Sequence, residues 1–202
     1  MILPFEPYNS QWKEMFGEIK CQLEESLQSI QPRVEHIGST AVEGLSAKPI
    51  IDIMIGVKDD LELNQVPLLL AGKQYVYYPK YNVEMPYRRF FVLLKDSPKE
   101  FGLPETIDIG EEIPEKMHNH DLRIAHIHVI PVTSENWTRH IAFRDYLRTF
   151  SAVKDEYQAL KEKLVQQQWE DGNDYNAGKD EFLKREEKQA IAWYSKQKEN
   201  EI

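Results

Sequence analysis

Residues 34–53 read VEHIGSTAVEGLSAKPIIDI and carry the most specific pattern in this chain of 202 residues. Their first part is expected to form a short strand that runs directly into Gly38 and Ser39. A loop of small and polar residues follows. A second strand then carries isoleucines on one face and Asp52 on the other, because strand side chains alternate. The pattern therefore predicts a strand, a Gly-Ser turn, a loop and a second strand with an acid at its centre.

The remaining hydrophobic pattern predicts an α/β (α+β) fold with one mixed sheet. Apolar residues recur at helical spacing from Ser10 to Ile30, which indicates an amphipathic helix with Ser10 as its N-cap. We expect strands at 33–37, 49–57, 75–78, 88–95 and 122–131, and a short helix at 64–72 with Pro67 in its first turn. We also expect helices after Ser134 and Ser151, a loop at 171–174 and a last helix. Residues 1–131 are thus expected to form the core, and residues 132–202 a helical segment packed on it.

A segment rich in proline, glycine and acids, residues 96–120, separates the last two expected strands. It holds seven acids and two lysines, so it carries −5 of the chain's formal net charge of −9. Long loops in compact domains are often lids or mobile insertions. A solvated acidic excursion and a lid beside a site are the two interpretations that the sequence leaves open.

Composition excludes several classes of protein. The net charge of −9 disfavours binding to nucleic acid, which normally requires a basic surplus. A single cysteine, Cys21, rules out an intrachain disulfide and agrees with a cytoplasmic location. The apolar stretches are shorter than a membrane span, and the first residues lack the features of a signal peptide, so we expect no membrane partner.

The turn at Gly38 and Ser39 and the acid at Asp52 are the first candidates for a functional site. Backbone N–H groups at such a turn attract anions, and serine adds a hydroxyl donor, although the same pair also occurs in ordinary turns. A carboxylate in the middle of an apolar strand is costly unless it is exposed, paired or bound to a cation. The two features together make this turn and the following strand the candidate site.

The stretch 34–53 closely resembles the signature of the GrpB-like family, bacterial proteins with a nucleotidyltransferase-like fold and a poorly defined function. Further blocks resemble the same family: PYNSQW at 7–12, RRFF at 88–91, HIHV at 126–129, WTRHIAFRDYL at 137–147, and Tyr175 with Lys179 and Phe182. The resemblance implies a nucleotidyltransferase-like mixed sheet with flanking helices. In that superfamily the Gly-Ser loop holds the triphosphate, and acids at alternating strand positions hold divalent metal.

The chain departs from the superfamily's metal site. Met54 stands where the second strand acid would fall, and methionine does not bind Mg²⁺. His126 or His128 stands in for the third acid, and the two are expected to share a strand face, with Cα atoms about 6.6 Å apart. We expect His36, Asp52, His126 and His128 to converge on a divalent metal, with Mn²⁺, Zn²⁺ and Mg²⁺ as candidates. A pair of hydrogen-bonded histidines that covers the sheet is the alternative.

The anion would be bound by the turn and by nearby bases. Gly38, Ser39, Lys48 and Arg88 are expected to bind the phosphate, with one of Arg88 and Arg89 pointing into the site. Because Asp52 would repel a bare phosphate, a divalent cation or a protonated His126 or His128 is expected to lie between them. Asp52 and His128 are the expected catalytic residues.

The function expected from this pattern is metal-dependent nucleotidyl transfer or the binding of a nucleotide or phosphorylated metabolite. The alternative is a catalytically inactive ligand-binding or interaction module. Similar chains form the C-terminal extension of dephospho-CoA kinases, so the resemblance implies a possible link to coenzyme A metabolism. The phosphate-binding pattern G-x-x-x-x-G-K-[ST] is absent, which makes kinase activity of this chain unexpected.

Overall fold

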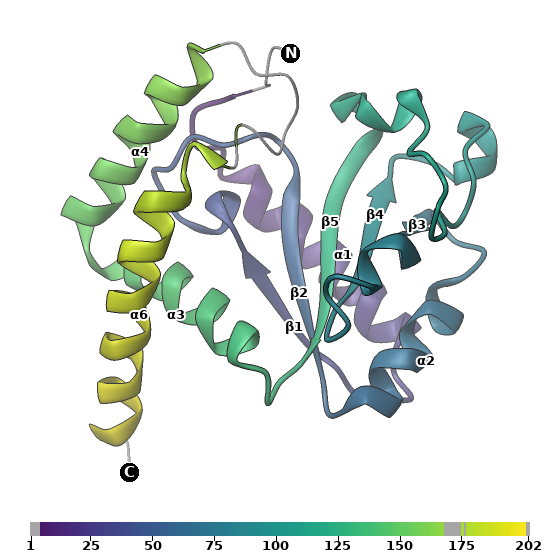
Figure 1. Cartoon of the computed structure of the whole chain (residues 1–202), viewed down its shortest axis with the longest axis horizontal. Coiled ribbons are helices and arrows are strands. Elements are labelled where there is room, and N and C mark those ends of the chain that lie inside the picture. Colours follow the sequence, from purple (N-terminus) through teal and green to yellow (C-terminus); the bar gives the residue numbers. More distant parts are fainter. Residues whose placement is uncertain (1–4, 168–174, 176, 201–202) are drawn as a thin grey trace.

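The computed structural model describes residues 5–167, 175 and 177–200 (Figure 1). Its helices and strands follow one another in the order α1 (Gln11–Ser26), β1 (Arg33–Ile37), β2 (Ile51–Val57), α2 (Asp60–Leu70), β3 (Tyr75–Tyr77), β4 (Arg89–Leu94), β5 (Arg123–Pro131), α3 (Glu135–Thr149), α4 (Ser151–Val165) and α6 (Asp180–Asn200). A short 3₁₀ turn, Ser39–Ala41, comes directly after β1. The loop expected at 171–174 lies outside the described residues.

The strands form one mixed sheet in the order β1-β2-β5-β4-β3. β2 and β5 run parallel, and the other neighbouring pairs run antiparallel. The first and last residues of each strand lie within two residues of the bounds predicted from the hydrophobic pattern. The prediction of an α/β fold with a mixed sheet is therefore confirmed. The strands of Asp52 and His126 are neighbours in this sheet.

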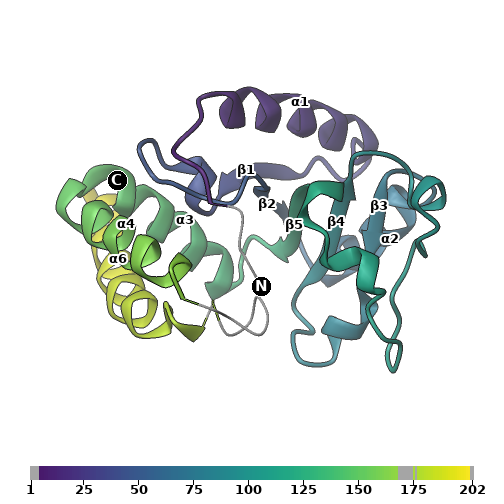
Figure 2. The same cartoon turned by 90° about the horizontal axis from the view of Figure 1, so that it is seen from above.

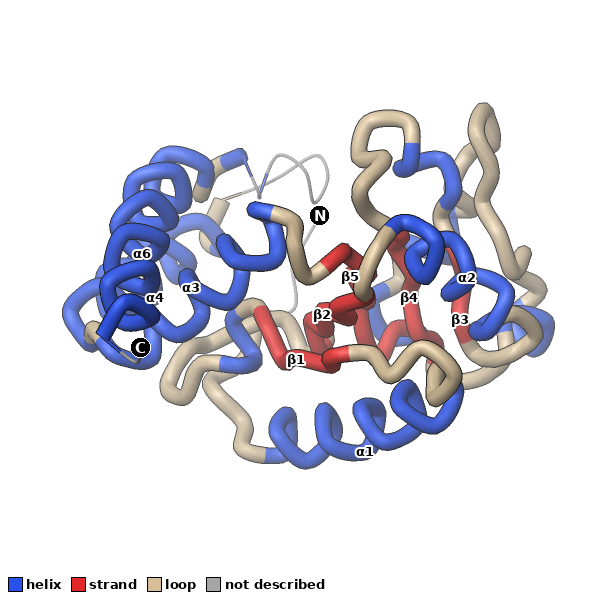
Figure 3. Tube along the Cα trace, turned by 90° about the horizontal axis from the view of Figure 1, so that it is seen from below, coloured by secondary structure: helices blue, strands red, loops and turns tan. Residues whose placement is uncertain are grey.

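One face of the sheet is covered by α1 and α2. Figures 2 and 3 show α1 lying across this face, on the side opposite α3, α4 and α6. Trp12, Ile19 and Leu23 of α1 pack against the buried side chains of β1, β2 and β5. Leu63 and Val66 of α2 join the same core. The apolar face predicted for the first helix is thus the face that it buries.

The second face of the sheet is divided between two coverings. Over β1 and β2, Trp137 and Ile141 of α3 pack on Ile37 and Met54. Over β3 and β4, buried side chains of the acidic insertion pack on the strands: Leu103, Ile107 and Met117 contact the cluster of Val76, Val92 and Leu94. The insertion is therefore anchored by an apolar core of its own, which a freely solvated excursion would lack. Part of this sheet face, over β2 and β5, lies between the two coverings and is left open by both.

Helix α2 begins earlier than the sequence pattern predicts. The carboxylate of Asp59 accepts hydrogen bonds from the backbone N–H groups of Leu61 and Glu62, so Asp59 caps a helix that starts at Asp60. Pro67 consequently lies inside the helix, and its predicted place in the first turn is wrong. The capping acid, whose side chain satisfies the first free N–H groups, defines the start of α2.

The C-terminal helices pack on the loop that follows β1. Leu147 of α3, Tyr157 of α4 and Phe182 of α6 are buried together with Val42 and Leu45 of that loop. The hydroxyl of Ser134 accepts a hydrogen bond from the N–H of Asn136 and caps α3 as predicted. Across the part of the chain that the structure describes, no helix has the length and hydrophobicity needed to cross a membrane.

Gly56 in β2 offers a test of how α3 is seated on the sheet. A Cβ at this position would lie 2.6 Å from atoms of Trp137 and Val132. Gly56→Ala is therefore expected to destabilise the protein by about 1–3 kcal/mol, as overpacking of a core does. The control is Gly17→Ala in α1, where nothing lies within 4 Å; it is expected to be neutral or to stabilise by about 0.5–1 kcal/mol. Urea unfolding measures both, and equal effects would contradict this packing.

Candidate functional site

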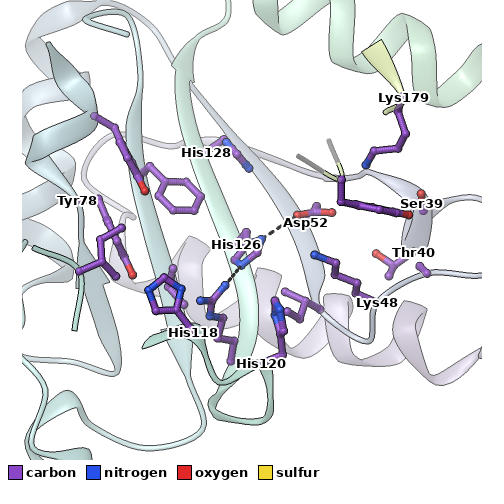
Figure 4. Close-up of a pocket in the computed structure, with 18 of the residues that line it drawn as sticks. Ser39, Thr40, Lys48, Asp52, Tyr78, His118, His120, His126, His128 and Lys179 are labelled. Carbon is purple, nitrogen blue, oxygen red and sulfur yellow. Dashed lines mark hydrogen bonds and ion pairs between the residues drawn. The ribbon is translucent and has the colours of Figure 1, made fainter. Parts of the chain in front are cut away.

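A cavity of about 830 Å³ opens over the part of β2 and β5 that neither covering hides. Its floor is formed by Asp52 of β2 and by His126 and His128 of β5. Figure 4 shows Ser39, Lys48 and Lys179 on one side of this floor, and Tyr78 and His118 on the other. Of the lining residues that the structure describes, five are lysines or arginines and two are carboxylates: Lys48, Arg88, Arg123, Lys161 and Lys179 against Asp52 and Glu84. In a chain of net charge −9, the cavity thus concentrates positive charge.

Gly38 lets the turn after β1 approach Asp52 closely. Its φ of 69° lies in the left-handed region that favours glycine, and a Cβ there would come within 2.5 Å of Oδ2 of Asp52. Asp52 pairs with Ile37 across β1 and β2, which brings the turn and the carboxylate together. The sequence prediction that these residues share one site therefore agrees with their placement.

Asp52 and His126 form a pair on the cavity floor. They are partners in the register of β2 and β5, and Nδ1 of His126 lies 3.4 Å from Oδ1 of Asp52. Nε2 of His126 lies 3.4 Å from a guanidinium nitrogen of Arg123, which has only hydrogens to donate. The imidazole therefore accepts from Arg123 and donates through Nδ1 to Asp52.

The environment keeps Asp52 ionised. Burial alone would raise its pKa, but the hydrogen bond with His126 and the positive charges nearby, including Lys179, outweigh burial and lower the pKa. The side chain is 35% exposed, so the carboxylate remains accessible from the cavity. Asp52 is thus a negative charge at the centre of a basic cavity.

His128 is held in its neutral form. Burial, and then the charge of Arg88, lower the pKa of His128 to about 3. A guanidinium nitrogen of Arg88 lies 3.3 Å from Nδ1, which accepts its hydrogen bond. Arg88 thus points into the cavity, whereas Arg89 bonds to Asn64 and to backbone carbonyls instead. A protonated His128 is therefore not the group that offsets Asp52 at neutral pH.

Lysines supply part of that positive charge, since the charge of Lys179 lowers the pKa of Asp52. We call Lys48, Lys161 and Lys179 the lysine cluster. Lys161 is only 2% exposed, and its Nζ donates to Oγ of Ser39, at 3.2 Å, and to the carbonyl of Ser46. The Nζ atoms of Lys48 and Lys179 lie over the ring of Tyr175, 5.5 and 4.5 Å from its centroid. Lysines from three separate segments therefore meet beside the Ser39 turn.

The three lysines of the cluster all have lowered pKa values. Burial, and then the charge of Lys179, lower the pKa of Lys161 to about 7. Burial, and then the charge of Lys48, lower the pKa of Lys179 to about 8. The pKa of Lys48 is also lowered, again mainly by burial. An anion between them would raise the pKa of each lysine, because a nearby negative charge favours the protonated form.

The comparisons with known proteins agree with this fold. The model of the family described as "GrpB protein" matches residues 4–189. The chain belongs to the GrpB family. It is 30% identical over 180 residues to the glutamate-rich protein GrpB of Alkalihalophilus pseudofirmus, covering 87% of this chain and 88% of that one.

Two further GrpB-family relatives extend this comparison. Identity to the UPF0157 protein YqkA of Bacillus subtilis is 31% over 186 residues, covering 92% of this chain. The chain spans only 46% of that relative's length. The crystal structure of the conserved protein GrpB from Enterococcus faecalis has a TM-score of 0.68 at 29% identity, covering 94% of this chain and 98% of that one. These names supply no substrate.

His36 does not join the cavity, and the expectation that it shares a face with Asp52 is wrong. It pairs with Ile53 across β1 and β2, so it points to the opposite face of the sheet. There its ring stacks on Phe16 of α1 at 4.7 Å, and Nε2 lies 2.9 Å from the hydroxyl of Thr40. Burial also lowers the pKa of His36 to about 4, so it is neutral.

The remaining donors do not fit a metal centre held by the protein. Within the described ranges, no three His, Cys, Asp or Glu side chains are placed to hold one ion. Met54, at the position of the missing acid, is fully buried beneath α3. Asp52 and His126 are left as two candidate ligands, already bonded to each other.

The sequence motifs do not indicate Lys161 or Arg123 as site residues, and they indicate Lys179 only through the resemblance to the family. A usable signal existed for Lys161. Tyr157, Lys161 and Leu164 follow the spacing of one buried helix face, and all three are buried. A lysine within such a stripe needs a partner or a cavity, because burying an unpaired charge is costly.

The close approach of the turn to Asp52 can be tested at Gly38. Gly38→Ala forces alanine into a backbone conformation with positive φ, which costs a residue other than glycine about 1–3 kcal/mol. The added Cβ would also clash with Asp52. Gly72→Ala is the matched control, because Gly72 has a φ of +70° and nothing within 4 Å. Urea unfolding should show a larger loss for Gly38→Ala than for Gly72→Ala. The extra loss of stability in Gly38→Ala should become smaller when Asp52 is also replaced by alanine. If it stays the same, the close contact between the turn and Asp52 is contradicted.

Proposed function

We propose that this protein binds a nucleotide or another phosphorylated small molecule in the cavity, with the phosphate at the lysine cluster. The observation that carries the proposal is the meeting of three lysines beside the Ser39 turn. Among the residues that the structure describes, the charge of Glu162 raises the pKa of Lys161 and that of Asp52 raises the pKa of Lys179, yet both pKa values stay below the usual lysine value. A dianionic ligand would bring further negative charge to them.

Phosphate matches this group of donors better than a carboxylate does. Ammonium groups, the Ser39 hydroxyl and the N–H groups of a turn are all donors, and a phosphate presents several acceptor oxygens to them. Two negative charges also offset more of the repulsion among the lysines than one charge would. Asp52 then lies beside the phosphate and limits how deeply the anion enters.

Binding is supported better than nucleotidyl transfer. Two-metal transfer needs carboxylates that clamp the ions, and Met54 replaces one of them. Asp52 is also bonded to His126, which itself accepts from Arg123. A metal-dependent transferase is therefore the second candidate, and the link to coenzyme A metabolism implied by the family resemblance remains a proposal about which phosphorylated compound is bound.

The lysine cluster can be tested with inorganic triphosphate as the probe. Lys179→Ala and Lys161→Met should each weaken its binding by about 10- to 100-fold, since a hydrogen bond to a charged group contributes about 1.5–3 kcal/mol. Ser39→Ala should cost less, because its hydroxyl is neutral. Isothermal titration calorimetry, with and without Mn²⁺, measures the affinities.

The matched control is Lys20→Ala, which removes an exposed lysine of α1 paired with Glu24. It should leave the affinity for triphosphate unchanged. If Lys179→Ala, Lys161→Met and Ser39→Ala all bind like the wild type, or if the wild type does not bind, the proposed phosphate site is wrong. A strict requirement for Mn²⁺ would favour the metal-dependent alternative.

The pH dependence of binding follows from the lowered pKa values. Only protonated lysines attract the anion, and in the free protein Lys161 and Lys179 lose their protons near pH 7 and 8. The affinity should therefore be highest below pH 7 and should fall by about tenfold or more between pH 7 and 9. Binding at pH 8 should take up protons, seen as a dependence of the calorimetric heat on the buffer. Lys161→Arg, which stays charged, should flatten the profile; an unchanged slope would contradict the assignment.

A further inference from the structure

The cavity has two chemically different ends. The lysine cluster and the Ser39 turn form one end, which Figure 4 shows on the far side of Asp52 from Tyr78. The other end contains three aromatic rings, and we call Tyr78, Tyr81 and Phe90 the aromatic end. The hydrogen-bonded pair of Asp52 and His126 lies between the two ends.

The rings of the aromatic end form one packed group. Tyr78 and Tyr81 stack nearly in parallel, with centroids 5.5 Å apart, and Phe90 tilts against them at 5.4 and 5.9 Å. Tyr78 is 3% exposed and supports the other two from behind. Tyr81 and Phe90 are only half-buried and line the cavity, so part of their ring surface faces its interior.

The surroundings of these rings favour a planar ligand group over an alkyl chain. Arg88 lies over the ring of Phe90, with its guanidinium carbon 5.3 Å from the centroid. Aromatic rings and flat guanidinium groups pack well against another planar ring, as they do against nucleic-acid bases. The size of the cavity points the same way, because about 830 Å³ suits a complete small-molecule ligand and far exceeds the space of one phosphate.

We propose that the ligand carries a planar aromatic ring opposite its phosphate, in the manner of a nucleoside phosphate, and that this ring lies against Tyr81 and Phe90. The proposal rests on the proposed phosphate site, because the lysine cluster fixes which end of the ligand lies where. The ring adds affinity that inorganic phosphates lack. Tyr81 and Phe90 then distinguish the ligand from other phosphorylated metabolites.

A ratio of affinities tests the aromatic end separately from the lysine cluster. Calorimetry compares inorganic triphosphate with ATP, GTP, CTP and UTP, all with the same excess of Mg²⁺. At least one nucleotide should bind the wild type about 10- to 100-fold more tightly than triphosphate. Tyr81→Leu and Phe90→Leu should bring this ratio towards one while the affinity for triphosphate stays the same. Lys179→Ala should weaken the binding of both kinds of ligand.

The matched control is Tyr146→Leu. Tyr146 is a half-buried ring of α3 that packs on Phe150 and Trp193 and does not line the cavity, so its loss should leave the ratio unchanged. The inference is overturned if triphosphate binds as tightly as every nucleotide, or if Tyr81→Leu and Phe90→Leu preserve the ratio. Nucleotide binding without triphosphate binding would support the aromatic end and reject the lysine cluster. No binding of either would reject both.

Discussion

The parallel pairing of β2 with β5 is the contact on which the rest of the site depends. It places Asp52 beside His126 and Met54 beside His128, so polar side chains from both strands reach the same face. A slip by one residue would turn this set towards α1, into an apolar core that could not solvate it. The neighbouring strands then complete the site, because β1 ends at the Gly38 turn and β4 begins beside Arg88.

Two separate apolar clusters hold the two coverings of the second sheet face, and the cavity lies between these coverings. The helical segment buries apolar side chains over β1 and β2, and the insertion does so over β3 and β4. Between them, the floor keeps a carboxylate, two imidazoles and their arginine partners. The acids that the structure describes lie mostly outside the cavity, so a basic volume persists inside an acidic protein.

The strands could be predicted from the sequence because alternating polar and apolar residues, and continuous apolar runs, indicate directly which residues of a strand are buried. The meeting of Gly38 with Asp52 was predictable too, since a hairpin-like return of the chain brings the end of β1 onto β2. The side that His36 faces was not predictable, because alternation within β1 does not show which of its residues lies opposite Asp52; the register, in which His36 pairs with Ile53, sets the face. The role of Lys161 could not be predicted, because helical spacing shows that a side chain is buried but not what it faces. The apolar anchors of the insertion, Leu103, Ile107 and Met117, were hidden in a segment dominated by acids.

The origin of the three lysines in three segments makes any bound anion part of the tertiary structure. Lys48 belongs to the loop before β2, Lys161 to α4, and Lys179 to the residues that lead into α6. Without a bound anion these three ammonium groups repel one another. With an anion bound between them, all three are attracted to it. By linkage, the occupied protein must hold its C-terminal helices more firmly than the empty protein, by an amount set by ligand concentration relative to Kd. Under the proposed function, the lifetime of this protein against proteolysis would then rise and fall with the supply of the proposed anion.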